Sequence, residues 1–376
     1  MKISKFLGIN NVADSTRLKP GEMTAATDID IGETENLLSR RGRTLLQAGA
    51  AHSPYEAAFG SLVVIDNNLM LLDAAGAVLR MVYDTLGYTR VWYATLPDGR
   101  VAFSNGLIQG LITAAETTEW GIPVPADPGE GIPGDTPYLI TYVRTSDGRE
   151  GPPVYGPLID TTQAIIGLPT LAGYSINVYF APYGGVTFLA GSTTSDTFLH
   201  SGALLGPQFV GTGLAPPPIG TQMATWGARV LIAQGKTLWA TRPMQPELCD
   251  LTRDFIQFEH EITLVYGADE GVFVGTTDGL FFLKGEVFGD LQLQDVAAGP
   301  VALGSLAEFP LRYLAEDARP KNGTDGALCL VDGYVHLLQG GNATALTAQK
   351  YRTSATEVFA TVRLRDGVMQ YLAAPV

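Results

Sequence analysis

The chain is poor in charged residues, in cysteine and in histidine. Lysine, arginine, aspartate and glutamate make up only 16% of its 376 residues, which include two cysteines and four histidines. No apolar run approaches the ~20 residues of a transmembrane helix, so we expect no membrane span. Two cysteines are too few for a cysteine-rich zinc site, and His52, His200, His260 and His336 show no metal-ligand spacing. We therefore predict no metal site and no cofactor.

The two cysteines and the amino terminus allow two further predictions, on the state of the thiols and on a signal peptide. Cys249 and Cys329 have no neighbouring cysteine and no histidine-rich context. Two buried free thiols are the favoured interpretation, with one disulfide as the alternative. Residues 1–7 carry charges but no long apolar core and no small-residue cleavage site, so we expect no signal peptide.

The charge balance is acidic, with a net charge of −14 at pH 7 and a pI near 4.7. Such a chain repels phosphate, which argues against sequence-specific nucleic-acid binding. A surface with few charges also leaves little repulsion between copies, so we expect a symmetric homo-oligomer.

Turn-forming and apolar residues are abundant, with 44 glycines, 23 prolines and an apolar content of 46%. Residues 261–285 show the pattern most clearly: apolar runs at 264–266, 272–276 and 280–283 are separated by Gly-Ala-Asp-Glu-Gly and Thr-Asp-Gly turns. Strand–turn–strand units of the same kind recur before residue 113 and after residue 218, at a spacing of ~40–45 residues. This repeat predicts an all-β, propeller-like body.

The sequence pattern changes in the middle of the chain. Residues 121–134 read as a glycine- and proline-rich linker, and several short strands follow at ~8–12-residue spacing. The pattern Tyr138-x-x-Thr-Tyr-Val-x-x-x-Asp-Gly-x-Glu-Gly-Pro resembles a fibronectin type III-like module. We predict three parts: 1–130 with the first blades, 131–217 as an inserted β-sandwich, and 218–376 with the blades that close the ring using strands from both chain ends.

The amino-terminal stretch carries a second resemblance. Gly-Ile-Asn-Asn-Val at 8–12, Leu-x-Pro-Gly-Glu at 18–22, Ala-x-x-Asp-Ile-Asp at 25–30 and Leu-x-x-Arg-x-Gly at 37–42 occur in this order. The series, together with residues 254–283, resembles tailed-phage virion proteins of the propeller-type tail, nozzle or stabilisation class. Arg40, Arg41 and Arg43 within it are interpreted as a solvated strand end, with a phosphate or sugar site as the alternative.

The resemblance implies a non-enzymatic structural protein of the virion, made in the host cytoplasm and placed in the tail, tail tip or baseplate. Its partners would be neighbouring tail proteins, with host cell-surface contact as a further role. Two alternatives remain: a receptor-binding tail-tip protein that contacts host glycan or pilus, and a propeller glycan hydrolase.

No catalytic residue is predicted. A propeller glycosidase needs two carboxylates across its channel, and Asp269, Glu270 and Asp278 all fall in predicted turns. Glu259, His260 and Glu261 are interpreted as strand residues that point to alternate faces. Asp66-Asn67-Asn68 and Asp325-Gly326 lack the spacing of a calcium loop. The four tryptophans, Trp92, Trp120, Trp226 and Trp239, are assigned to blade cores, with sugar platforms or interface anchors as the alternative.

Overall fold

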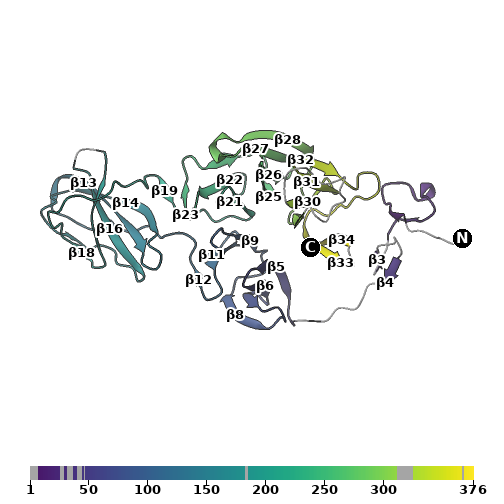
Figure 1. Cartoon of the computed structure of the whole chain (residues 1–376), viewed down its shortest axis with the longest axis horizontal. Helices are drawn as coiled ribbons and strands as arrows, with labels where there is room; N and C mark the ends of the chain where they lie inside the picture. Colours follow the sequence, from purple (N-terminus) through teal and green to yellow (C-terminus); the bar gives the residue numbers. More distant parts are fainter. Residues whose placement is uncertain are drawn as a thin grey trace.

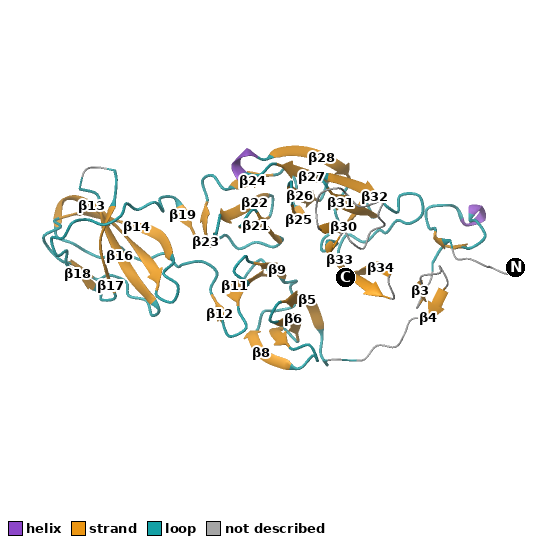
Figure 2. Cartoon of the chain, in the orientation of Figure 1, coloured by secondary structure: helices purple, strands orange, loops and turns teal. Residues whose placement is uncertain are grey.

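The computed structural model describes residues 7–25, 29–31, 37–39, 45, 47–182, 185–310, 325–365 and 368–376. Arg40, Arg41 and Arg43 lie outside these residues. Strands dominate the described part of the chain, where the helical turns are two short 3₁₀ segments, Ser15–Arg17 and Phe288–Asp290 (Figure 2). No helix in this part is long and apolar enough to span a membrane.

Four of the sheets are four-stranded antiparallel meanders that follow the chain order. The first two blades contain β5 (Ala51–Ala57), β6 (Gly60–Ile65), β7 (Asn68–Leu72), β8 (Val78–Tyr83), β9 (Trp92–Thr95), β10 (Val101–Ser104), β11 (Gln109–Ile112) and β12 (Thr117–Thr118). The fourth and fifth contain β25 (Ile262–Ala268), β26 (Gly271–Thr276), β27 (Gly279–Lys284), β28 (Gln292–Ala298), β29 (Ala307–Pro310), β30 (Asp325–Val331), β31 (Tyr334–Gln339) and β32 (Asn342–Ala345).

The third and sixth blades depart from this pattern. The third is built from β20 (Met223–Trp226), β21 (Arg229–Gln234), β22 (Thr237–Arg242) and β24 (Phe255–Gln257), with β23 (Gln245–Asp250) and β19 (Leu214–Ala215) added beside β22. The sixth has two strands among the described residues, β33 (Val358–Arg365) and β34 (Val368–Pro375). The prediction of an all-β propeller body with an inserted sandwich is confirmed, and the described blades number six.

The six blades form a ring around a central cavity. One cavity is lined by residues of β5, β9, β20, β25, β29 and β33, the first strand of each blade. Separate apolar clusters join the first blade to the second, the second to the third, and so on to the sixth. Burial of these facing sheet surfaces, at roughly 25 cal/mol per Å², is the main stabilising contribution to the body.

Hairpin turns set the register within each blade. Asp66 and Asn67 connect β6 to β7 with φ values of 47° and 71°. Both residue types tolerate the left-handed conformation that two-residue hairpins demand. The pairing Val64↔Leu69 then places two fully buried side chains on the face that packs against the second blade.

The inserted unit lies between the second and third blades in sequence and at one end of the molecule (Figure 1). One sheet has the order β14-β13-β16-β17 and the other pairs β15 with β18. These strands are β13 (Pro133–Arg144), β14 (Glu150–Ile159), β15 (Ile165–Ile166), β16 (Tyr174–Phe180), β17 (Phe188–Thr193) and β18 (Thr197–Phe198). Tyr138, Ile140 and Phe198 belong to a shared apolar core. The fibronectin type III-like character of this unit stays a prediction.

The amino-terminal strands lie at the opposite end of the molecule from the inserted unit (Figure 1). They are β1 (Gly8–Ile9), β2 (Glu22–Met23), β3 (Ile29–Ile31) and β4 (Leu37–Ser39). β1 pairs with β2 in parallel, and β3 pairs with β4 in antiparallel fashion.

Two local predictions were wrong. For Thr241–Glu247 the sequence predicts a loop that precedes the strands of 261–285. The structure instead has a turn at Pro243 and Met244, where Met244 has a φ of 59°, and this turn returns the chain into β23. Glu259–Glu261 is not a strand, since this segment bends from the outer strand β24 to the inner strand β25 of the next blade. The predicted linker at 121–134 is attached at its start, because Ile122 is fully buried in the core of the inserted unit.

Candidate functional site

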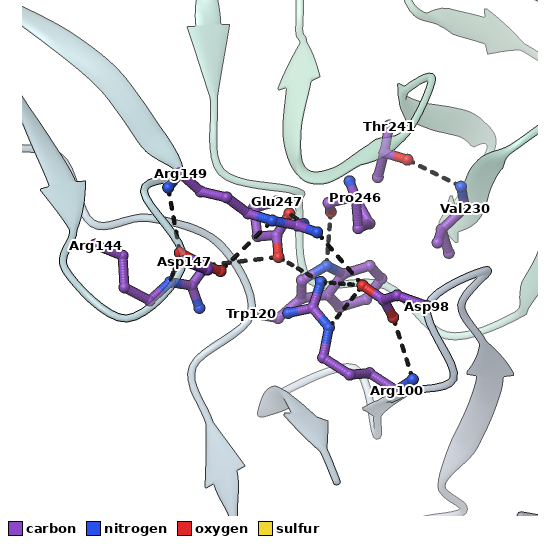
Figure 3. Close-up of polar contacts among 10 residues, drawn as sticks. All are labelled: Asp98, Arg100, Trp120, Arg144, Asp147, Arg149, Val230, Thr241, Pro246 and Glu247. Carbon is purple, nitrogen blue, oxygen red and sulfur yellow. Dashed lines mark hydrogen bonds and ion pairs between the residues drawn. The ribbon is translucent and has the colours of Figure 1, made fainter. Parts of the chain in front are cut away.

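Two Asp-Gly-Arg turns meet where the inserted unit joins the propeller. Asp98 and Arg100 belong to the β9–β10 turn of the second blade, and Asp147 and Arg149 belong to the β13–β14 turn of the inserted unit. Both arginines point toward Glu247 on β23 (Figure 3). The Glu247 side chain is only 2% exposed. We call Asp98, Arg100, Arg144, Asp147, Arg149 and Glu247 the junction cluster.

Glu247 is the centre of the junction cluster. Its Oε1 accepts a hydrogen bond from Arg100 Nη2 at 2.7 Å and lies 3.5 Å from Arg144 Nη2. Its Oε2 accepts from Arg149 Nη1. A buried carboxylate needs compensating charge and hydrogen bonds where it lies, and here the compensation comes from both the second blade and the inserted unit.

The remaining carboxylates balance the remaining positive charge. Asp98 Oδ2 accepts from Arg100 Nη2 at 2.7 Å and lies 3.4 Å from Arg149 Nη2. Asp147 lies within 3.5 Å of both Arg144 and Arg149. Burial raises the pKa of the Asp98 carboxyl, but hydrogen bonds from Arg100 outweigh this effect and leave its pKa below the ordinary value. Three guanidinium groups therefore face three carboxylates in a network without net charge.

A neutral contact strengthens the same junction. The indole Nε1 of Trp120, which is 4% exposed, donates a hydrogen bond to the Pro246 carbonyl at 2.8 Å. Trp120 lies on the segment that leaves the second blade, and Pro246 lies on β23. The segment that enters the inserted unit is thus attached to the third blade beside the junction cluster.

The central cavity is the second candidate site. It has a volume of about 830 Å³ and is lined by side chains that include Tyr55, Tyr93 and Trp92. The rings of Tyr55 and Tyr93 stack with centroids 4.9 Å apart. Burial raises the pKa of both phenols, so they stay protonated at neutral pH. These rings offer the cavity flat apolar faces and neutral hydroxyl groups.

Two carboxylates also line this cavity, Glu56 on β5 and Glu308 on β29. Sequence reasoning missed both, because nothing in a strand sequence marks the residues that point to the ring centre. Glu56 accepts a hydrogen bond from Ser61 Oγ at 2.8 Å. The carboxylates that were weighed from the sequence lie elsewhere: Asp269, Glu270 and Asp278 are exposed turn residues, and none of the three lines the cavity.

Ser53 lines the cavity and lies beside a histidine. His52 Nδ1 is 2.9 Å from Ser53 Oγ, and burial lowers the pKa of His52. Ser53 is 4% exposed, and its Oγ also accepts a hydrogen bond from Val91 N–H at 2.9 Å. A nucleophile needs an open approach to its substrate, whereas this hydroxyl is enclosed and connects β5 to the start of the second blade.

Arg90 links the two ends of the propeller chain beside the cavity. Its Nη2 donates to the Val358 carbonyl at 2.6 Å, and its guanidinium lies 3.9 Å from the centre of the Phe359 ring. The side chain is 9% exposed. Arg90 precedes the second blade and Val358 begins the sixth, so this contact ties the last blade to the first two.

The other residues considered in the sequence analysis are either exposed at the surface or packed within the fold. His260 is exposed and lies 3.7 Å from Asp278, His336 is buried, and His200 stacks edge-on against Phe180. Asp325 and Gly326 lie in β30. Trp226 is buried in a blade core, Trp239 packs against Phe255, and Cys249 and Cys329 are buried free thiols, as predicted. No cluster of metal-ligating side chains occurs among the described residues.

Comparisons with known proteins show only general likeness. No protein-family model and no curated protein matches the sequence. Similar solved structures include BBS1N in complex with ARL6DN (11% identity, 88% of this chain and 94% of that one, TM-score 0.35). Others are a streptogramin B lyase (8%, 88% and 92%, TM-score 0.33) and the extracellular domain of BT4673 from B. thetaiotaomicron (12%, 92% and 45%, TM-score 0.36). Likeness at this level carries no conclusion about function.

The junction cluster yields a stability prediction. Glu247→Ala leaves three guanidinium groups without their central carboxylate, and we expect unfolding to be easier by about 3–5 kcal/mol. The matched control is Glu270→Ala, which removes an exposed turn carboxylate and should stay within about 0.5 kcal/mol of the parent. Denaturant unfolding of both variants compares them directly. Equal stabilities would contradict the structural role assigned to Glu247.

Arg90 yields a second prediction, on how the ring is closed. Arg90→Lys keeps the positive charge but loses the planar group over Phe359, and we expect a loss of about 1–3 kcal/mol. Hydrogen exchange should quicken in residues 358–364 and stay unchanged in β26. Exchange that quickens equally in both blades would indicate general destabilisation and would contradict a local role at the ring closure.

Proposed function

We propose that this chain is a non-enzymatic structural component of a tailed-phage virion that joins neighbouring tail proteins within the tail, tail tip or baseplate. The observation that carries the proposal is the junction cluster, which fixes a second folded unit on the propeller through a buried, charge-balanced network. A scaffold that transmits force or sets spacing needs such a rigid connection. The sequence resemblance described above supplies the class of particle.

The distribution of contact elements supports a connecting role. The inserted unit and the amino-terminal strands lie at opposite ends of the propeller (Figure 1). The segment after β18 exposes Leu199, Leu204 and Val210, at 61%, 100% and 87%. Exposed apolar side chains on a chain with little charge favour contact with other proteins. Repetition around a symmetric ring would multiply many modest contacts into a stable assembly.

The glycan-related alternatives rest on the central cavity. Tyr55, Tyr93 and Trp92 could face a sugar ring there, and Glu56 and Glu308 are the carboxylates a hydrolase would use. A double variant, Glu56→Gln with Glu308→Gln, separates the hydrolase alternative from the structural proposal, because only hydrolysis needs the two carboxylates. Under the structural proposal, phage that carry it assemble and infect as the parent does.

The proposal predicts the place of the protein in the particle. Mass spectrometry of phage purified by density gradient should find the chain at a fixed copy number set by ring symmetry. Washing in high salt should leave this copy number unchanged, because a structural component is not adsorbed. Its absence from intact particles, or a variable amount that salt removes, would refute the proposal.

A further inference from the structure

The lining of the central cavity is buried on one side and exposed on the other. Where β5 and β20 begin, it contains Ser53 and Gln222, each of which is 4% exposed. Thr95 at the end of β9 and Thr361 within β33 also line the cavity, and both are exposed. A ligand would therefore enter beside these two threonines and have its far end enclosed next to Gln222.

Aromatic rings form much of the cavity wall. Tyr55 and Tyr93 stack on each other, and Trp92 and Phe359 line the cavity as well. The guanidinium of Arg90 lies 5.1 Å from the centre of the Trp92 ring and 3.9 Å from the centre of the Phe359 ring. Four aromatic rings offer flat apolar surfaces, which favour a flat apolar ligand.

Most hydroxyl groups of the cavity are already paired within the chain. The hydroxyls of Tyr55 and Thr95 share a hydrogen bond of 2.7 Å, and Thr225 Oγ1 donates to the Thr95 carbonyl at 2.7 Å. The Tyr93 hydroxyl donates to the Ser53 carbonyl at 3.1 Å. A sugar needs a partner for each hydroxyl that it buries. The paired state of these groups therefore favours a ligand with few polar atoms.

Three buried polar atoms at the cavity lack a partner. Gln222 Nε2, Arg90 Nε and Thr263 Oγ1 make no hydrogen bond within the described part of the chain, and all three residues line the cavity. A buried donor without a partner is costly. Because the terminal amide of glutamine rotates readily, Gln222 can present an N–H group to a ligand that carries an oxygen acceptor.

The charges beside the cavity disfavour a negatively charged acceptor. The Glu56 carboxylate lines the cavity and has no ion pair among the described residues. Burial and, to a smaller extent, the negative charge of Glu308 raise the pKa of Tyr55. The positive charge of Arg90 is already placed 3.7 Å from Glu357. The acceptor is therefore expected to be a neutral hydroxyl or carbonyl group.

We propose that the central cavity binds a flat, uncharged aromatic group with one oxygen acceptor, which the Gln222 amide recognises at the enclosed side. The rings of Tyr55, Tyr93, Trp92 and Phe359 would contact the faces of this group. A phenol is the simplest example, and it can belong to a tyrosine of another protein or to a free aromatic molecule. The inference concerns the isolated chain and does not depend on the proposed virion function.

Calorimetric titration of the purified, full-length protein tests the proposal with two probes. They are p-cresol, which has the phenol hydroxyl, and toluene, which lacks it. We expect the parent protein to bind p-cresol about 5-fold more tightly than toluene. Gln222→Met keeps a long side chain but removes the amide, and it should abolish this preference. Gln257→Met, on the exposed outer strand β24, is the matched control and should keep it.

Two further measurements locate the site and identify the source of the aromatic group. Ala360 lines the cavity, so Ala360→Phe should fill it and abolish binding of both probes. Denaturant unfolding shows whether each variant is folded. N-acetyltyrosinamide carries the phenol on a peptide unit. Binding of this probe would assign the site to a tyrosine of another protein, whereas binding of p-cresol alone would assign it to a free molecule.

Three results would overturn the proposal. The parent protein could show no saturable binding of p-cresol. Folded Ala360→Phe and Gln222→Met variants could bind p-cresol as tightly as the parent, which would place the probe elsewhere. Methyl glucoside could displace p-cresol, which would make the cavity a sugar site.

Discussion

Burial of the Glu247 carboxylate imposes a constraint that organises the middle of the molecule. A carboxylate that is 2% exposed cannot be left without partners, and its partners here come from two folded units. Arg100 reaches it from the second blade, and Arg144 and Arg149 reach it from the inserted unit. If the inserted unit turned away from the propeller, Glu247 would keep Arg100 but lose Arg144 and Arg149, and these two arginines would lose its carboxylate. The relative orientation of the two units is thus tied to a single electrostatic arrangement.

The propeller beneath this junction is stabilised differently. Its blades are held by apolar faces in contact, with Phe273 and Phe282 among the fully buried residues between the fourth and fifth. Such contacts set the spacing of successive blades, but none of the apolar clusters in the described residues joins the sixth blade to the first. Arg90 makes this connection at the cavity, where its guanidinium lies on the Phe359 ring. Arginine side chains join the inserted unit to the propeller and the sixth blade to the first two, whereas apolar packing joins successive blades.

The sequence predicts the repeated strands and turns of the blades better than it predicts which residues, distant in sequence, come together in the fold. Alternating apolar residues and Asp-Gly or Asn-Asn turns predict blades because hairpin geometry is local. The sequence predicts a loop at Glu247, because the short Pro243-Met244 turn gives no sign of the strand that follows it. The one signal that was available is the repeat of Asp-Gly-Arg at 98–100 and 147–149. Two identical turns on separate units suggest a shared partner, but only tertiary structure identifies that partner as Glu247. Glu56 and Glu308 could not have been found in the same way, because the side of a strand that faces the ring centre depends on closure of the whole ring.

The claim that the inserted unit is rigidly fixed on the propeller can be tested by one distance measurement. Cys249 and Cys329 are fully buried, and burial raises the pKa of each thiol to about 12, so spin labels should react only with introduced cysteines. Ser195→Cys places a label on the inserted unit, and Glu270→Cys places one on the fourth blade. Double electron–electron resonance should give a single narrow distance distribution at neutral pH. A broad or multi-peaked distribution would show that the unit moves freely, and would contradict the account.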